Sequence, residues 1–384
     1  MESCIPLPPQ SLDIVRSCET LLFADKSFAL FRLPGKEPVL LLQKDRKEHL
    51  YPSFGGVEGT GFVLCPFAEG QGHPVVLIRD DEKYTGWDNI AAGLAGIIRR
   101  DNLEHMTVPE TVSCDFAGLK ERLYKAPRDT GYTKALQCFL KELSGGHFQK
   151  LVLSRSQDIA GRFSAARIFL NACASCPHAM VSLVHGSCGT WIGASPEILM
   201  QGSLAGGWQT MALAGTRKSG TEGAWDDKNR HEQAIVADYI RQVLTPAAAD
   251  LTESEAYTFQ AGGVEHLRTD FAFKTKESMR IQDVVHSLHP TPAVCGLPKE
   301  RAQQCILTTE TQDRRYYSGF LGFWDNGQAC SLYVNLRCLK LSQQGVRLYA
   351  GGGILPQSDP DSEWLETCGK MCTMLALLGE MPED

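Results

Sequence analysis

The stretch LYVNLRCLKLSQQGVRLYAGGGILPQSDPDSEWLETCGKMCTMLALL, residues 332–378, decides the fold class. Its apolar residues predict two strands, 332–339 and 346–350, on either side of the polar turn SQQG. From Ser358 to the end of the stretch the apolar spacing becomes helical, with Ser358 as the expected N-cap. A hairpin followed by a helix favours antiparallel sheets over a doubly wound parallel sheet.

Similar signals recur along the rest of the chain and predict an α+β fold. Residues 27–33 and 38–42 are expected to form one hairpin, and 181–184 with 191–194 another. Further strands are expected at 61–66, 74–78 and 148–154, and further helices at 129–143 and 226–244.

Composition excludes several classes of protein. The 384 residues allow one large unit or two closely packed ones, and 43% apolar with 22% charged residues is ordinary for a soluble globular protein. No apolar run is long enough to span a membrane. The net charge of −7 argues against a nucleic-acid partner, and Arg99-Arg100 and Arg314-Arg315 are interpreted as solvated pairs.

Cysteine usage points to a reducing compartment. The chain has 14 cysteines, and no secretory signal is visible at its beginning. We therefore expect reduced thiols and a cytoplasmic protein rather than a disulfide framework. The lone CxxC of Cys173 and Cys176 lacks the context of a zinc ribbon or a thioredoxin.

The C-terminal helix carries charged residues in a pattern that suggests a site. Glu363, Glu366 and Lys370 follow at i, i+3 and i+7, so they share one helical face. Because this helix is apolar nearly all round, it is expected to be buried with its carboxylates facing a cavity. A surface ladder of ion pairs is the alternative.

Glu232 repeats this pattern on the helix expected at 226–244, where it lies on the apolar stripe. An unpaired carboxylate there would be costly, and a hard cation with oxygen ligands is one way to satisfy it. Pairing with Lys228 or Arg230 at the edge of the stripe is equally compatible with the sequence.

Lys150 shares a strand face with Phe148 and Val152. A lysine on an apolar face gives up its proton more easily than in water and can serve as a general base, although many such lysines reach solvent instead. The glycine-rich segments around Gly215 and Gly352 lack the context of a phosphate-binding loop, but they would let backbone N–H groups approach a carboxylate.

Eight motifs follow one another along the chain: KLVLSR (150–155), SPE (195–197), LAGT (213–216), RHE (230–232), HPTPAV (289–294), LR (336–337), AGGGI (350–354) and EWLET (363–367) with Lys370. In this order they resemble the chorismate-utilising enzymes, a family that includes isochorismate, salicylate, anthranilate and aminodeoxychorismate synthases. The resemblance extends over residues 129–378 and is looser before that.

The resemblance implies one compact unit of packed antiparallel sheets with helices outside and the active site in the cleft between the layers. Residues 1–115 would complete the sheet layers, and 116–384 would form the chorismate-binding core. The implied roles are Mg²⁺ binding by Glu232, Glu366 and, partly through water, Glu363; general base Lys150; general acid Glu197; and substrate binding by Gly215, Thr216, His266, Tyr317 (or Tyr316), Arg337, Gly352, Gly353 and Lys370.

Two positions discriminate among the family's members. Ala214 stands where aminodeoxychorismate synthases place a lysine, and residues 292–296, PAVCG, differ from the GTLSG-type segment of anthranilate synthases. Water is therefore the expected nucleophile, and no glutaminase partner is expected. The resemblance implies a monomeric isochorismate synthase acting on chorismate, in a menaquinone, siderophore or salicylate pathway that the sequence leaves open. Salicylate synthase is the alternative, and an anthranilate synthase component or a silent chorismate-binding homologue is disfavoured.

Overall fold

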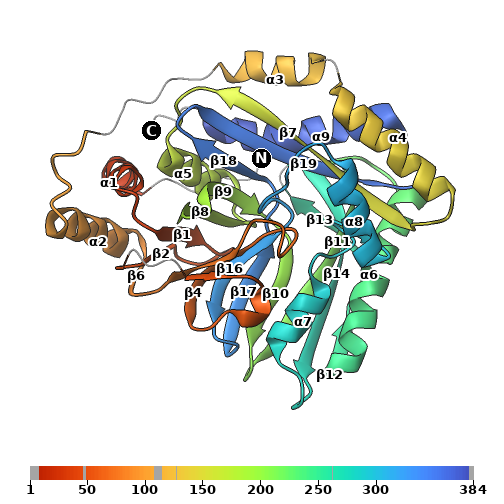
Figure 1. Cartoon of the computed structure of the whole chain (residues 1–384), viewed down its shortest axis with the longest axis horizontal. Coiled ribbons are helices and arrows are strands. Elements are labelled where there is room, and N and C mark those ends of the chain that lie inside the picture. Colours follow the sequence, from red (N-terminus) through yellow and green to blue (C-terminus); the bar gives the residue numbers. More distant parts are fainter. Residues whose placement is uncertain (1–7, 46–48, 108–114, 127, 262, 380–384) are drawn as a thin grey trace.

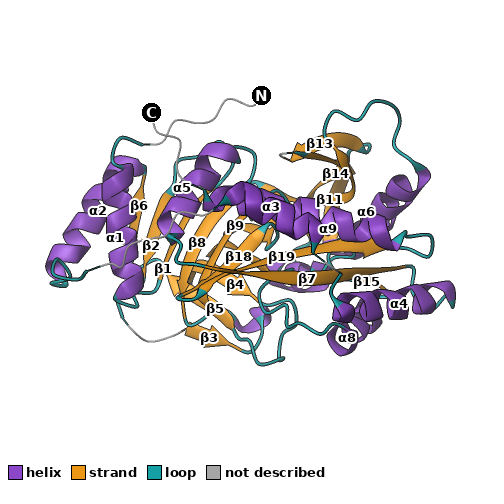
Figure 2. Ribbon diagram, turned by 90° about the horizontal axis from the view of Figure 1, so that it is seen from above, coloured by secondary structure: helices purple, strands orange, loops and turns teal. Residues whose placement is uncertain are grey.

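The computed structural model describes residues 8–45, 49–107, 115–126, 128–261 and 263–379. Over this part of the chain the fold is α+β, as predicted, with two large antiparallel sheets and helices on their outer faces (Figures 1 and 2). None of the described helices combines the length and apolar character needed to cross a bilayer. Each described cysteine is a free thiol.

The first sheet, sheet A, has nine strands among the described residues, every neighbouring pair antiparallel. Its order is β15 (Gly296–Leu297), β7 (Lys150–Ala160), β19 (Gly345–Ile354), β18 (Cys338–Ser342), β9 (Gly189–Ser195), β8 (Met180–Gly186), β1 (Phe28–Arg32), β2 (Val39–Leu42) and β6 (Glu82–Thr85).

The second sheet, sheet B, has ten strands in the same described ranges and is also antiparallel throughout. Its order is β12 (Ala248–Glu253), β14 (Val264–Thr275), β11 (Gly207–Lys218), β10 (Ile198–Ser203), β17 (Ala329–Val334), β16 (Phe320–Asp325), β4 (Thr60–Cys65), β5 (Val75–Arg79) and β3 (His49–Tyr51), with β13 (Tyr257–Ala261) paired to β14.

The helices lie outside the sheets. They are α1 (Ser11–Phe23), α2 (Trp87–Arg100), α3 (Phe116–Lys125), α4 (Thr130–Ser144), α5 (Ala165–Ser175), α6 (Asp227–Ala247), α7 (Ile281–Leu288), α8 (Lys299–Thr309) and α9 (Pro360–Leu375), with short 3-10 turns η1 (Phe54–Gly56) and η2 (Ala376–Leu378).

Three apolar clusters hold the layers together. One packs α1, α2, α4, α5 and α9 on sheet A, and a second packs α6 and α7 on sheet B. The third contains side chains of both sheets, including Phe31 and Trp191 from sheet A and Phe62 and Tyr333 from sheet B. Both sheets therefore bury one face against helices and meet in a shared core, and the N-terminal strands contribute to each sheet.

Most of the predicted elements are confirmed. The hairpins β1–β2 and β8–β9 form, as do the strands β4, β5 and β7 and the helices α4 and α6. Asp129 caps α4 by accepting a hydrogen bond from the backbone N–H of Tyr132 at 2.8 Å. Ser358 as the cap of the last helix is wrong by one residue, because Asp359 accepts the bond from the N–H of Ser362.

The prediction of one strand over 332–339 is also wrong. Those residues form the end of β17 in sheet B and the start of β18 in sheet A, so the chain crosses between the sheets at 335–337. Arg337 there has φ of 47°, a left-handed backbone that breaks the strand. Apolar residues in both halves hid the crossing, since both halves pack into apolar clusters: Leu332 and Val334 with α6 and α7, Leu339 with α9, and Tyr333 and Cys338 in the shared cluster.

The interpretation of Arg314 as a solvated residue is wrong. Its side chain is 2% exposed and pairs with Glu310, which is 3% exposed. The guanidinium also donates to the carbonyl oxygens of Val152 at 2.7 Å and Val294 at 2.8 Å. Glu310 in turn accepts from the backbone N–H of Ser154 at 2.7 Å. This buried pair fastens β7 to the segment after α7.

We expect Arg314→Met to lower the free energy of unfolding by about 3–5 kcal/mol, because it leaves a buried carboxylate without its partner. Arg347→Met is the matched control, since Arg347 pairs with Asp158 at a 43% exposed surface position. Its loss should cost about 1 kcal/mol or less. Urea unfolding of both variants measures the difference, and equal losses would contradict the structural role of Arg314.

Candidate active site

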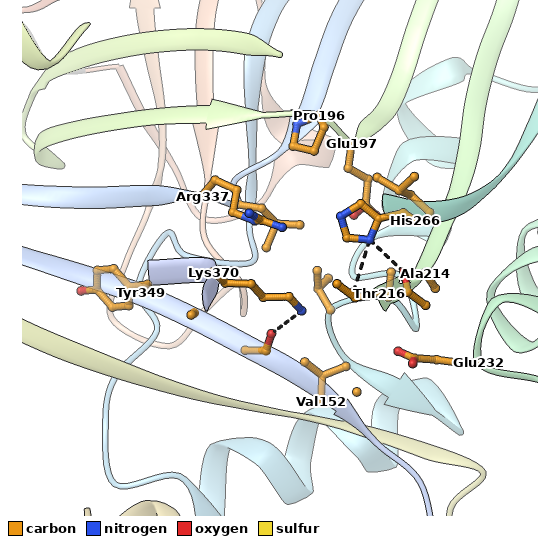
Figure 3. Close-up of a pocket in the computed structure, with 18 of the residues that line it drawn as sticks. Val152, Pro196, Glu197, Ala214, Thr216, Glu232, His266, Arg337, Tyr349 and Lys370 are labelled. Carbon is orange, nitrogen blue, oxygen red and sulfur yellow. Dashed lines mark hydrogen bonds between the residues drawn. The ribbon is translucent and has the colours of Figure 1, made fainter. Parts of the chain in front are cut away.

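A cavity lies where the two sheets, α6 and α9 approach one another (Figure 3). Sheet B supplies Leu213 to Thr216 from β11 and His266 from β14, and sheet A supplies Tyr349 to Gly351 and Gly353 from β19. Glu197 follows β9, and Arg337 stands at the crossing between the sheets. Segments distant in sequence thus meet in one concave site, as binding sites commonly do.

The structure brings most of the predicted site residues to this cavity. The predicted site residues that line it are Glu197, Gly215, Thr216, Glu232, His266, Tyr317, Arg337, Gly353 and Lys370. The other four connect to these by contact or close approach: Lys150 with Glu232, Glu366 with Lys370, and Gly352 near Glu363 and Glu366. Tyr316 does not line the cavity, and its hydroxyl donates to the carbonyl of Pro74 at 2.8 Å.

Lys150 is fully buried, so the alternative of a lysine reaching solvent does not hold. Its Nζ lies 2.9 Å from Oε1 of Glu232, a close ion pair whose angles are not those of a hydrogen bond. Gly353 of β19 makes this approach possible, because a Cβ at that position would overlap Oε1 of Glu232 and lie 2.8 Å from Cε of Lys150. Because Gly353 has no side chain, there is room for the charged groups of Lys150 and Glu232 to lie this close.

Glu197 differs from an ordinary surface carboxyl group in both its burial and its ionisation. It is 3% exposed, and burial raises its pKa to about 8 even though Lys150 and Lys370 act in the opposite direction. At neutral pH this side chain is a carboxylic acid and can donate a proton. A buried glutamic acid within reach of a buried lysine's charge is the arrangement expected of an acid–base pair.

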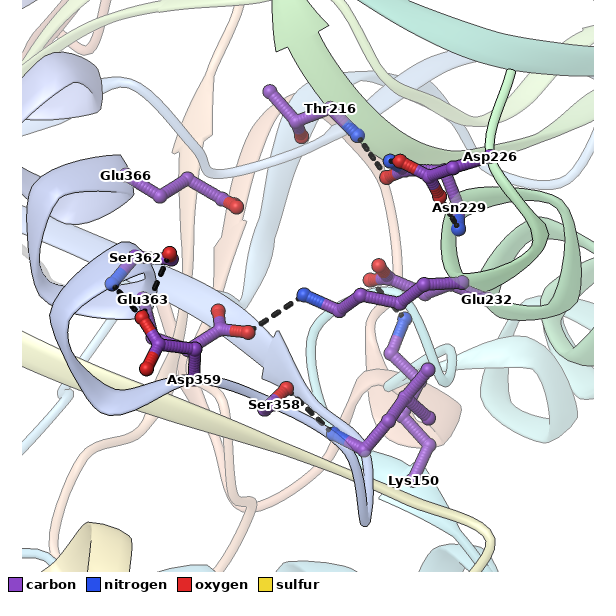
Figure 4. A network of polar contacts seen from close by, with 12 residues as sticks. Lys150, Thr216, Asp226, Asn229, Glu232, Ser358, Asp359, Ser362, Glu363 and Glu366 are labelled. Atoms are coloured by element: carbon purple, nitrogen blue, oxygen red, sulfur yellow. Dashed lines mark hydrogen bonds and ion pairs between the residues drawn. The ribbon is translucent and has the colours of Figure 1, made fainter.

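The three predicted metal ligands are each paired with a lysine (Figure 4 shows the carboxylates of Glu232, Glu363 and Glu366). The N–O distances are 2.9 Å from Lys150 to Glu232, 2.6 Å from Lys228 to Glu363 and 2.6 Å from Lys370 to Glu366. The surface-ladder alternative therefore fails for Glu363, which is 1% exposed. Three negative and three positive charges balance one another at this end of the cavity.

The neighbouring charges set the ionisation of these groups. Burial, and then the nearby Glu366, raises the pKa of Glu363. Burial opposes ionisation of Glu366 too, but Lys370 and Lys228 outweigh it and lower its pKa. For Lys228, Glu363 and the other two carboxylates outweigh burial and raise the pKa, so its side chain is an ammonium.

The carboxylates fit a hard divalent cation in chemistry, although they are not gathered as metal ligands here. In the described ranges no three acidic, histidine or cysteine side chains form a ready metal-binding group. However, Oε2 of Glu363 is buried and accepts no hydrogen bond from any described residue. It points, with Oε1 of Glu366, toward Gly352, where an added Cβ would lie 3.2 and 3.7 Å from these oxygens. Carboxylate oxygens that accept no hydrogen bond are suitable ligands for Mg²⁺.

Positively charged side chains that line the cavity could hold anions. Arg337 and Lys370 both line it, and Lys370 is held by the carbonyl oxygen of Gly351 at 2.9 Å. His266 donates from Nδ1 to the carbonyl of Gly215 at 2.8 Å, which leaves Nε2 as an acceptor. Burial, and the positive charges of Arg337 and Lys370, lower the pKa of His266 to about 3, so the ring is neutral.

Sequence reasoning missed two residues that shape the site. Asn229 Oδ1 accepts a hydrogen bond from the N–H of Thr216 at 2.9 Å and sits against Gly215, which has φ of 73°. Lys228, which the sequence suggested only as an alternative partner of Glu232, pairs with Glu363 instead, and Glu232 pairs with Lys150. Asn229 and Lys228 both precede Glu232 in the first turn of α6, and a helical-wheel view places Asn229 on the face of Glu232.

Comparison with known sequences now gives a family for this site. Residues 89–379 match the sequence model of the family described as "Chorismate binding enzyme". The chain belongs to this family. It is 33% identical over 202 residues to the isochorismate synthase EntC of Escherichia coli K12, covering 50% of this chain and 51% of that protein. It is 32% identical over 271 residues to the isochorismate synthase MenF of the same strain, covering 66% and 61%. The chain thus spans about half to three-fifths of these relatives.

Solved structures share the fold of this chain. A putative 2,3-dihydroxybenzoate-specific isochorismate synthase, DhbC from Bacillus anthracis, superposes with a TM-score of 0.72 at 22% identity, over 96% of this chain and 99% of that one. Anthranilate synthase component I from Streptococcus pneumoniae superposes with a TM-score of 0.63 at 16% identity, over 91% and 92%. At these identities the likeness concerns the fold.

The ionisation of Glu197 predicts a pH-dependent stability. Its pKa is about 8 in the native state against 4.5 for an ordinary glutamate, so between these pH values the unfolded chain binds fewer protons. The native state therefore loses stability as pH rises through this window, by on the order of 4 kcal/mol from this group. Glu197→Gln has no such ionisation and should lose less stability between pH 5 and pH 8.

Urea unfolding at both pH values measures this effect. Glu222→Gln, at an exposed position, serves as the control and should follow the wild type. If Glu197→Gln and the wild type lose stability in parallel, Glu197 is not the buried acid described above.

Proposed function

We propose that this chain is a magnesium-dependent isochorismate synthase. The reaction adds water at C2 of chorismate and expels the C4 hydroxyl, so one water molecule enters and another leaves. The observation that carries the proposal is the pair formed by a fully buried Lys150 and a buried Glu197 whose pKa of about 8 keeps it protonated. The named relatives, both isochorismate synthases, support the same reaction.

The two groups have complementary tasks. As general base, Lys150 first gives up the proton of its ion pair with Glu232 and then accepts a proton from the attacking water, while the carboxylic acid of Glu197 donates its proton to the leaving hydroxyl. In the reverse direction the two groups exchange roles, as a reversible reaction requires. The cavity wall includes small and apolar residues such as Val152 and Ala214, which leave room for a ring.

The charged groups at the two ends of the cavity hold a dicarboxylate. Arg337 and Lys370 supply positive charge for the carboxylates, and Gly215 and Thr216 line the cavity beside them, with the N–H of Thr216 already donated to Asn229. Glu232, Glu363 and Glu366 would hold Mg²⁺, which when bound neutralises the ring carboxylate. The neutral His266 has an acceptor nitrogen available for a substrate hydroxyl.

The choice of water over ammonia is supported by the cavity wall. Ala214 lines the cavity, so a methyl group stands where a nucleophilic lysine would be needed for an aminodeoxychorismate synthase. Ala293 and Val294 add further apolar wall. These residues offer no side chain that could bind or activate ammonia.

Incubation of the purified protein with chorismate, with and without Mg²⁺, tests the proposal. We expect isochorismate, identified by chromatography and NMR, only when Mg²⁺ is present, and reversible loss of activity with EDTA. Added ammonium salts should yield no anthranilate or aminodeoxychorismate. Glu232→Gln and Glu366→Gln should weaken metal and substrate binding together.

Several results would contradict the proposal. Full turnover in either glutamine variant without added metal would exclude the magnesium site. Salicylate with pyruvate as the main product would indicate a second, eliminating step, and an amino product would show that the nucleophile is ammonia.

The pH dependence of kcat/KM separates base from acid. The acid must be protonated, so the rate should fall as pH rises through about 8, the pKa of Glu197. Glu197→Gln should remove this basic limb, and Lys150→Ala should remove the activation of water while leaving the limb of Glu197 in place. Each change should lower kcat by roughly 10²–10⁴-fold. Near-normal turnover of Lys150→Ala with an unchanged profile would show that another group activates the water.

A further inference from the structure

Lys228 stands out because it bridges two helices that are remote in sequence. It lies in the first turn of α6, and its Nζ donates to Oε1 of Glu363 on α9 at 2.6 Å, across 135 residues of chain. Glu363 is 1% exposed, and its Oε2 accepts no hydrogen bond from the described residues. Lys228 is therefore the ammonium paired with the most deeply buried carboxylate of the site, which the side chain of Ser358 also stabilises.

The three lysines paired with carboxylates differ in how easily the ammonium group can move away from its partner. Lys150 is 0% exposed and Lys370 is 17% exposed, and Lys370 is also fastened to the carbonyl of Gly351. The side chain of Lys228 is 30% exposed, so its ammonium can reach water by a rotation of its flexible stem. Of these three, Lys228 is the one that could exchange its place for another cation.

We propose that the ammonium of Lys228 holds the cation position beside Glu363 in the metal-free protein and moves to solvent when a divalent cation binds. The inference rests on the magnesium site of the proposed function. An ammonium and Mg²⁺ beside one carboxylate would repel each other strongly at low dielectric. Lys228 contacts Oε1 of Glu363 and leaves Oε2 for the cation, so repulsion between the two cations favours release of Lys228, and Lys228 competes with the cation.

This competition has two consequences. Lys228 keeps the empty site stable by compensating Glu363, because a buried carboxylate without a partner is costly. The same residue weakens cation binding, since part of the attraction of Glu363 for the cation is already satisfied. Removing Lys228 should therefore destabilise the metal-free protein and tighten its binding of Mg²⁺.

Calorimetric titration with MgCl₂, without chorismate, tests this inference on the wild type, Lys228→Met and Lys228→Gln. Both variants should bind Mg²⁺ about tenfold more tightly than the wild type. Lys228→Gln can still donate a hydrogen bond to Glu363 and serves if Lys228→Met folds poorly. Arg230→Met is the matched control, because it removes the same charge from the same turn of α6 while Arg230 pairs with the exposed Asp227.

Thermal unfolding of the same proteins supplies a second readout that does not depend on turnover. Without Mg²⁺, Lys228→Met should melt below the wild type, and saturating Mg²⁺ should raise its melting temperature by more than that of the wild type. Arg230→Met should respond to Mg²⁺ as the wild type does.

The outcomes separate this inference from the proposed function. Equal Mg²⁺ affinity in the wild type and both Lys228 variants would overturn the competition. Equally tight binding by Arg230→Met would overturn it too, because the gain in affinity would then come from the lower positive charge of the helix end alone. A lack of any Mg²⁺ response in all four proteins would contradict the magnesium site itself and this inference with it.

Discussion

The pairing of β7 with β19 is the contact on which the rest of the site depends. It runs from Leu151 opposite Ile354 to Ala160 opposite Gly345, so it sets the glycine segment of β19 against the part of β7 that follows Lys150. The chain then turns directly into α9, which carries Glu363, Glu366 and Lys370. One register thus places the proposed base, two carboxylates and a substrate-binding lysine, and a slip of one residue would turn these strand faces over.

Charge balance is the second constraint, and it explains how the carboxylates of Glu232, Glu363 and Glu366 can lie close together in a partly buried site. Each carboxylate has an ammonium within 2.6–2.9 Å, while Glu197, which has no such direct partner among the described residues, remains protonated instead. Buried acids either find a cation or give up their charge. The cavity uses both solutions side by side, and this difference between carboxyl groups is what lets one of them act as an acid.

Much of this could be predicted from the sequence, because local patterns and ordered motifs carry it. The hairpins, α4 and α6 follow from periodicity, and most of the site residues expected from the motifs line one cavity. Three features depended on long-range packing and were missed. The strand crossing at 335–337 has no local marker, the burial of Arg314 depends on Glu310 and on carbonyls far along the chain, and Lys228 finds Glu363 only after α6 and α9 meet.

The glycines at 351–353 also limit how this protein can be engineered. None of the three has a left-handed backbone, so their conformations alone would accept alanine, a replacement that often stabilises a chain by restricting its unfolded state. Space forbids it instead, because a methyl group at Gly353 would displace Glu232 and Lys150, and one at Gly351 would press on the hydroxyl of Tyr317. Consensus or thermostability libraries should leave this tripeptide unchanged, since any gain in rigidity would come at the expense of the ion pair beneath it.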